Sequence, residues 1–268
     1  MADLAVTAPG TSSSPVRTNV VTFVRTNARL LVSPAIIVGI SVLLYTYVTN
    51  FLDSDDAIFQ DERSLDWDRN LRPQLEQHIS LTLWSTVFVI VVAIPLGIAL
   101  TRPAYRRFGN PVLAVATSGQ ATPAFGLLIL AYAWLGSGPW TAVWALGFFT
   151  ILPVLRNTMV GLDQVNPSVI EAGRGMGLTR RQVLRQIELP LAVPVILAGI
   201  RTALIINVGM AALAFLIGGG GLGVTISTGL KLKRDVVLIT GAGMTAIVAL
   251  TVDWIAAIIE RALRPRGL

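Results

Sequence analysis

The 268-residue sequence contains no cysteine and a single histidine, His78. Without cysteine the chain can form no disulfide, no thiolate metal site and no cysteine nucleophile. One histidine cannot build a metal site that needs several imidazole ligands. The phosphate-binding pattern Gly-x-x-x-x-Gly-Lys-Ser/Thr is also absent, so this chain is not expected to hydrolyse ATP itself. These absences exclude most metal-dependent and cysteine-dependent catalysis.

Charged residues are also scarce. They make up 13% of the sequence, against 53% hydrophobic residues, and the mean hydropathy is +0.69. Soluble domains carry about a quarter charged residues. A soluble globule with so few charges would expose large apolar patches to water, which monomers rarely do. Lipid is therefore the expected solvent for much of the chain.

Six stretches are long and apolar enough to cross a bilayer as helices, which takes about 20 residues each. They lie at about 30–51, 79–100, 111–136, 139–156, 192–217 and 236–259. Glycine and proline interrupt the third stretch, and the turn before the fourth is short. The sequence thus predicts an all-α, polytopic membrane protein with six transmembrane helices.

Arginines in the short connections predict the orientation, because Lys and Arg stay on the cytoplasmic side. Arginines precede the first span and follow the second, fourth and sixth, which places both termini in the cytoplasm. The segment between the first two spans is acidic and falls outside. One connection disagrees, since Lys231, Lys233 and Arg234 also fall outside.

Composition divides the chain into five expected parts. They are a mobile cytoplasmic tail rich in Ser, Thr and Pro (1–29), an extra N-terminal span (30–51), an acidic external segment (52–77), the membrane domain proper (78–260) and a basic cytoplasmic C-terminus (261–268). The tail has no helical periodicity, which favours disorder.

The longest cytoplasmic connection after the tail, about 157–191, contains two helix starts. Asn166-Pro167 pairs a side-chain cap with a proline at the first helical position. Thr179 and Gln182 match a capping box, and Pro190 is expected to end that second helix. The loop should present two short helices at an angle. These could dock into a groove of another protein or pack on their own membrane ends.

The same loop resembles a family signature. Glu171-Ala172-Gly173, Gly177, Ile187 and Leu189-Pro190 match the EAA loop of ABC importer permeases, which reads Glu-Ala-Ala, three residues, Gly, nine residues, Ile, one residue, Leu-Pro. Gly173 is the one departure, because the pattern has Ala there. Residues 94–102, 122–128, 194–202 and 217–223 further resemble osmoprotectant-type permeases, which import glycine betaine, choline, carnitine or related compounds. The resemblance covers most of 78–260 and leaves out the N-terminal parts.

The resemblance implies a type I ABC importer permease fold in a bacterial inner membrane. Two permease subunits, identical or homologous, would enclose the path, and an external binding protein or lipoprotein would deliver the solute. ATP and Mg²⁺ would sit on two separate ATPase subunits, so this chain would hold no cofactor. Its net charge of +6 is explained by the cytoplasmic arginines, without a nucleic-acid partner.

In that family the loop inserts a helix into a groove of the ATPase. The residues expected at this coupling site are Glu171, Ala172, Gly173, Gly177, Leu178, Ile187, Leu189 and Pro190. Glu171 would meet polar or basic groups of the ATPase, Gly177 would permit a sharp turn, and Leu189-Pro190 would fix the exit into the next span. The alternative for Glu171 is a solvated acid favoured by the helix dipole.

The expected substrate path is lined by Thr122, Pro123, Phe125, Trp144, Phe148 and Arg201. Aromatic faces hold quaternary ammonium ions best, although Trp and Tyr also gather at membrane interfaces for other reasons. For Arg201 a structural or interface role is favoured over direct contact with the substrate, and Asp253 has no evident partner. Gly218-x-Gly220-x-x-Gly223 follows an apolar helical run rather than a strand, so it is not a dinucleotide site.

Other hypotheses remain open on the sequence alone. The EAA loop indicates coupling to an ATPase and does not indicate which solute is transported, so an amino acid or another betaine is an alternative solute. A secondary transporter or channel would need no ATPase. A membrane-bound enzyme lacks support, because no acid, base and nucleophile converge in the sequence.

Overall fold

The structure, a computed structural model, describes the backbone of residues 16–263. These residues form helices joined by short connections, and no strand occurs among them. Five helices are long and apolar enough to cross a membrane, and one bent pair of helices brings the number to six. This confirms the predicted all-α membrane fold.

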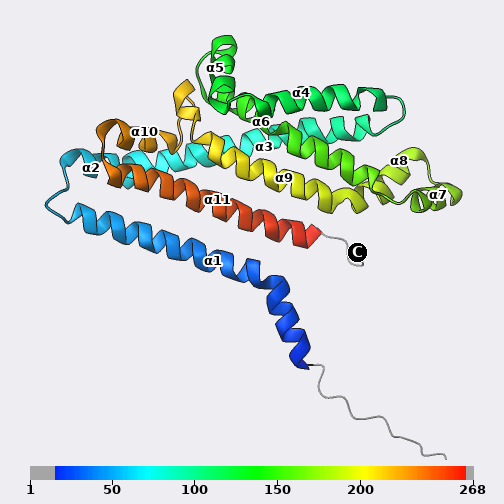
Figure 1. The fold of residues 1–268 in the computed structure, drawn as a ribbon, viewed down its shortest axis with the longest axis horizontal. Coiled ribbons are helices and arrows are strands. Elements are labelled where there is room, and N and C mark those ends of the chain that lie inside the picture. Colours follow the sequence, from blue (N-terminus) through cyan, green and yellow to red (C-terminus); the bar gives the residue numbers. More distant parts are fainter. Residues whose placement is uncertain (1–15, 264–268) are drawn as a thin grey trace, which may run out of the picture.

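The helices follow one another along the chain as Figure 1 shows. The longer ones are α1 (Val16–Leu52), α3 (Arg72–Leu100), α4 (Gly109–Ala121), α5 (Ala124–Leu135), α6 (Pro139–Asp163), α9 (Leu189–Ala211) and α11 (Asp235–Leu263). The shorter ones are α2 (Phe59–Ser64), α7 (Pro167–Gly175), α8 (Arg180–Val183) and α10 (Gly223–Leu232). Single turns of 3₁₀ or π geometry are η1 (Trp67–Leu71), η2 (Arg106–Phe108), η3 (Leu184–Glu188) and η4 (Ala214–Ile217).

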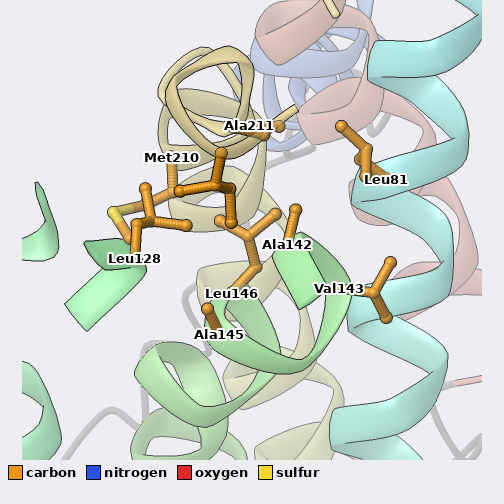
Figure 2. Close-up of a cluster of buried hydrophobic side chains, with 10 residues drawn as sticks. Leu81, Leu128, Ala142, Val143, Ala145, Leu146, Met210 and Ala211 are labelled. Carbon is orange, nitrogen blue, oxygen red and sulfur yellow. The ribbon is translucent and has the colours of Figure 1, made fainter. Parts of the chain in front are cut away.

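Helices α3, α6 and α9 form the core of the bundle. One cluster of buried apolar side chains, shown in Figure 2, joins Leu81 of α3 to Leu146 of α6 and Met210 of α9. A second cluster lies further along the same three helices and includes Val89 and Val154. These helices are apolar nearly all round because each is covered by neighbours or by lipid.

Small residues let the core helices approach closely. A Cβ on Gly97 of α3 would come within 2.8 Å of the Thr158 side chain on α6, and one on Gly199 of α9 within 2.8 Å of the Pro153 carbonyl oxygen. Inside a membrane, helices associate through such close contacts and through hydrogen bonds, because lipid removes the usual hydrophobic drive. The glycines therefore set the spacing of the bundle.

A buried polar ladder also ties the three core helices together. The Nδ2 group of Asn207 on α9 donates to Thr86 Oγ1 on α3 (3.1 Å), and Thr150 Oγ1 on α6 donates to Asn207 Oδ1 (3.1 Å). All three side chains are buried. Interhelical bonds of this kind contribute about 0.6 kcal/mol each in membrane proteins. Here they fix the rotation of each helix against the others.

The third predicted span, 111–136, is wrong as a single helix. Helices α4 and α5 meet at an angle of 103°, and Figure 1 shows α5 turned away from the bundle. Thr122 and Pro123 between them are extended, with ψ of 138° and 129°. The residue before a proline avoids the helical region, which breaks the helix at this point.

The fifth predicted span, 192–217, is also wrong at its second end. Helix α9 stops at Ala211, and η4 then leads into a glycine loop, which we define as residues 218–222. Gly218, Gly220 and Gly221 all have positive φ, a conformation that glycine adopts without strain. The other spans lie within longer helices, and Pro73 lies in the first turn of α3.

The N-terminal region departs from the predicted tail over part of its length. Helix α1 begins at Val16, so residues 16–29 are helical, while the remainder of the predicted tail, 1–15, lies outside the described residues. Further along, α1 runs beside α11 (Figure 1). Its residues Val48, Phe51 and Leu52 pack on a small core that includes Val236 and Val237 of α11.

The acidic segment supplies a partner for Arg234, one of the three basic residues in the connection that breaks the charge rule. Asp61 of α2 is fully buried and accepts from the Arg234 guanidinium, including a 2.9 Å contact from Arg234 Nε to Asp61 Oδ1. Arg234 also donates to the Asp56 carbonyl oxygen (2.9 Å). The hydrogen bond with Asp61 holds the pKa of Arg234 above its ordinary value. Arg234 therefore has an acidic partner at this end of the bundle.

Candidate functional site

The loop from α6 to α9 forms the candidate site and lies at the opposite end of the bundle from α2 and α10 (Figure 1). Both predicted helix starts are confirmed. Asn166 accepts the Ser168 backbone N–H (3.0 Å), and Thr179 and Gln182 form the reciprocal capping box. Gly177 has φ of +87° between the two helices, which is the left-handed conformation that ends a helix.

The prediction that Pro190 ends the second helix is wrong. Helix α8 continues through the π turn η3 into α9, so residues 180–211 form one unbroken helical run. Pro190 falls in the first turn of α9. Pro190 lies just after the π turn η3, where the regular α-helical hydrogen bonding is already interrupted, so its missing N–H does not end the helical run.

Gly173 is the residue through which α7 rests on the rest of the protein. It is buried, and a Cβ at this position would lie 2.5 Å from Ile187 Cδ1, with Leu178 and Val183 within 3.7 Å. Gly173, Leu178 and Ile187 therefore form a packing face beneath α7. This close contact requires a small residue at position 173, where this chain has glycine and the family pattern has alanine.

The opposite side of α7 is open to the surroundings. Glu171 and Ala172 are exposed, and so are the apolar side chains of Val169 and Met176, the latter at 75%. Large apolar groups exposed beside charges are typical of a surface that another protein covers. The signature thus serves two purposes, because some of its residues seat the helix and others face outward.

The last two residues of the signature are placed apart from α7. Leu189 packs at the edge of a buried cluster that includes Leu162 and Ala192, and Pro190 is exposed. They fix the start of α9 and do not share the exposed face of α7.

A buried ion pair lies at the base of the loop, and it was not predicted from the sequence. Arg102, just beyond the end of α3, donates to both carboxylate oxygens of Glu188, with 3.2 Å from Nη1 to Oε1. The Glu188 side chain is only 6% exposed. Glu188 occupies the unspecified position between Ile187 and Leu189 of the signature, so the pattern gave no signal for it.

Two predicted path residues share an apolar groove of about 470 Å³. Trp144 and Phe148 of α6 line it together with Phe88 of α3 and with Trp134 of α5. The Phe88 and Trp144 rings meet edge to face at 4.6 Å. Thr122, Pro123 and Phe125 are not among its lining residues. They lie at the bend between α4 and α5 and at the start of α5.

Arg201, the remaining predicted path residue, lies in an ion pair between α9 and α11. Its Nε and Nη2 groups donate to the two carboxylate oxygens of Asp253 (2.6 and 2.9 Å), and Nη1 lies 3.4 Å from Glu260. This supplies the partner that Asp253 lacked in the sequence. The arrangement fits the structural or interface role that was favoured for Arg201.

Comparison with known proteins decides the family. Residues 93–265 match the model of the binding-protein-dependent transport system inner membrane component. The chain belongs to this family. The transport-system family model begins within α3, so α1 and α2 lie outside it.

Named relatives in the transport-system family are permeases. The chain is 41% identical to the glycine betaine/carnitine/choline transport system permease protein OpuCB of Bacillus subtilis, over 72% of this chain and 88% of that protein. It is 44% identical to the osmoprotectant import permease protein OsmY of Salmonella typhimurium, over 71% and 80%. Among solved structures, an inward-facing MetNI methionine ABC transporter chain matches with a TM-score of 0.64 and 25% identity, covering 73% of this chain and 96% of that one.

Membership settles the general class of this protein. The chain is a multi-pass membrane permease subunit of an ABC importer rather than an enzyme. The family transports with the help of a binding protein.

Proposed function

We propose that this chain forms one half of the path through an ATP-driven importer for quaternary ammonium osmoprotectants such as glycine betaine, choline and carnitine. The observation that carries the proposal is α7, a short helix held out from the end of a rigid bundle with an exposed mixed surface. The names of the permease relatives support the solute class.

In this proposal α7 couples the membrane bundle to the ATPase. Two copies of α7, one on each permease subunit, would each enter a groove on one of two ATPase subunits that bind ATP and Mg²⁺. Glu171 and Ala172 would contact the groove, while Gly173 and Ile187 keep α7 seated. ATP binding would draw the two loops together and favour one of two packings of the permease pair.

The aromatic groove would serve the solute. A quaternary ammonium ion is attracted to the face of an aromatic ring within about 6 Å, and Phe88, Trp134 and Trp144 line this groove. Weak, multiple contacts suit a path, because the solute must also leave. Selection would then rest mainly on the external binding protein.

The orientation follows from the arginines. We propose that α7 and both termini face the cytoplasm of a bacterial inner membrane and that the acidic segment faces outside, where the binding protein docks.

Reconstitution into liposomes with the cognate ATPase and binding protein tests the proposal. We expect uptake of radiolabelled glycine betaine, choline or carnitine that requires ATP, and little uptake of methionine. Uptake of methionine alone would identify an amino-acid importer. Uptake without ATP would identify a secondary transporter and contradict the proposal.

Glu171→Arg tests the coupling surface in the same assay. Reversing this exposed charge is expected to lower uptake about tenfold or more, the size of a typical coupling energy. Glu171→Arg should also reduce co-purification of the ATPase, whereas Glu62→Arg, the same charge change on α2 at the other end, should leave co-purification of the ATPase close to wild type. Full uptake by Glu171→Arg would place the contact elsewhere.

A further inference from the structure

Helices α3 and α9 are joined near both ends and in the middle. Along the chain, α9 connects the loop that carries α7 to the glycine loop at the far end of the bundle. Helix α3 has no covalent connection to either loop. Any movement that α3 shares with them must therefore pass through side-chain contacts.

The first contact is the ion pair of Arg102 and Glu188. Arg102 Nε also donates to the Ile98 carbonyl oxygen (3.3 Å), which holds the guanidinium against the last turn of α3. Glu188 ends the π turn η3, and its neighbour Ile187 supports α7 at Gly173. The pair thus links the support of α7 to α3.

The middle contact is the bond between Asn207 of α9 and Thr86 of α3 (3.1 Å). Both side chains are buried, with Asn207 fully so. Further toward the outer end, the Nε2–H of His78 on α3 donates to the Val208 carbonyl oxygen of α9 (3.0 Å). These bonds resist sliding of one helix along the other.

The outer contact fastens the glycine loop and the start of α10 to α3. Gln77 Oε1 accepts the Gly221 backbone N–H (3.1 Å), and Gln74 Oε1 accepts both the backbone N–H (3.0 Å) and the hydroxyl (2.5 Å) of Thr225. A Cβ on Gly220 would lie 2.2 Å from Gln77 Oε1. The loop is shaped to fit against the outer end of α3.

We propose that Arg102 and Glu188 are positioning residues that make α3 follow α9 as one body when α7 moves, so that the glycine loop at the outer end shifts with it. Helix α3, about 43 Å long at 1.5 Å per residue, is the rigid strut of this body. The inference rests on the proposed function, because it assumes that an ATPase displaces α7. Loss of the ion pair would leave a buried charge and let the inner ends of α3 and α9 separate.

The test measures solute uptake per ATP hydrolysed in the reconstituted importer. We expect Glu188→Gln and Arg102→Gln each to lower this ratio about tenfold, and the exchanged pair Arg102→Glu with Glu188→Arg to recover most of it. Asp163→Asn is the matched control, because Asp163 at the end of α6 pairs with Arg106 on an exposed surface (3.9 Å) and should leave the ratio unchanged. An unchanged ratio in Glu188→Gln would overturn the inference.

A second measurement on the otherwise unaltered chain covers the case in which the variants fail to assemble. The sequence has no cysteine, so Val91→Cys on α3 and Ile205→Cys on α9, both exposed, give a unique pair for spin labels. Labelled subunits diluted with unlabelled ones report distances within one subunit. We expect the distance to change by less than about 2 Å between nucleotide-free and ATP-trapped importer, well below the about 5.4 Å by which one helix moves past another when it slips by one turn.

A larger change would show that the two helices move separately and would overturn the inference. Failure of the proposed function is distinguishable, because the unmutated importer would then show no ATP-dependent uptake at all.

Discussion

Some positions in this protein require a small residue because a neighbouring side chain occupies the adjacent space. Gly173 lies so close to Ile187 that a Cβ would stand 2.5 Å from the end of that side chain. The atom that it would meet is the terminal methyl of a side chain that can rotate. Alanine, which the family pattern has here, is therefore accommodated by a small movement, whereas a long side chain is not.

Gly173→Ala should accordingly change the free energy of unfolding by less than about 1 kcal/mol, because the helix propensity gained is opposed by crowding against Ile187. Gly173→Leu should push α7 off Leu178 and Val183 and prevent co-purification with the ATPase. Thermal unfolding of the purified subunit and pull-down with the ATPase measure the two effects. Equal ATPase retention by both variants would contradict the packing described for α7.

The contacts that the sequence could not reveal are those between distant residues. Arg201 and Asp253, like Arg102 and Glu188, are separated along the chain, and their pairing depends on how the helices are rotated against each other. No local pattern encodes that rotation. Such pairs are visible only once the helices are packed.

At the scale of helices, the positions where helices begin and end were easier to predict than the angles between consecutive helices. Asn166, Thr179 and Gly177 act through their own backbone neighbours, so the short helices of the loop could be read from the sequence. The turn at Thr122–Pro123 was signalled by its residues, yet the apolar stretches on both sides favour one span by length. Mean hydropathy measures how long and how apolar a stretch is but not the direction of its helix axis. It therefore could not predict the 103° bend between α4 and α5.

The attachment of α2 allows a test at this scale. Asp61→Asn leaves Arg234 without its buried counter-charge, and burial makes an unpaired charge costly. We expect α1 and α2 to loosen from α11 and trypsin to cut after Arg63 several times faster. Asp66→Asn is the control, since Asp66 also caps a helical turn and pairs with an arginine, but at 3.8 Å on the surface. Equal cleavage of both variants would mean that the Asp61 pair does not hold α2 in place.

For the molecule as a whole, the two ends of the bundle carry different chemistry. One end presents α7 and the arginines of its loop, and the other presents the acidic segment and the glycine loop. The Asp61–Arg234 pair gives Arg234 an acidic partner at its end of the bundle, whereas Lys231 and Lys233 are exposed there. The proposed orientation, with α7 inside, rests on the arginines of the other connections.

Cysteine labelling decides this orientation without background, because the sequence contains no cysteine. Met176→Cys, directly after α7, and Lys231→Cys at the end of α10 are exposed positions at opposite ends of the bundle. A membrane-impermeant maleimide should label Lys231→Cys in spheroplasts, with the outer face of the inner membrane exposed, and Met176→Cys only in inside-out vesicles. The positive-inside rule is statistical, whereas this pair of positions reports both faces at once. Labelling of Met176→Cys in spheroplasts would place α7 where no ATPase can reach it, and the assignment of α7 as the coupling helix would fail with it.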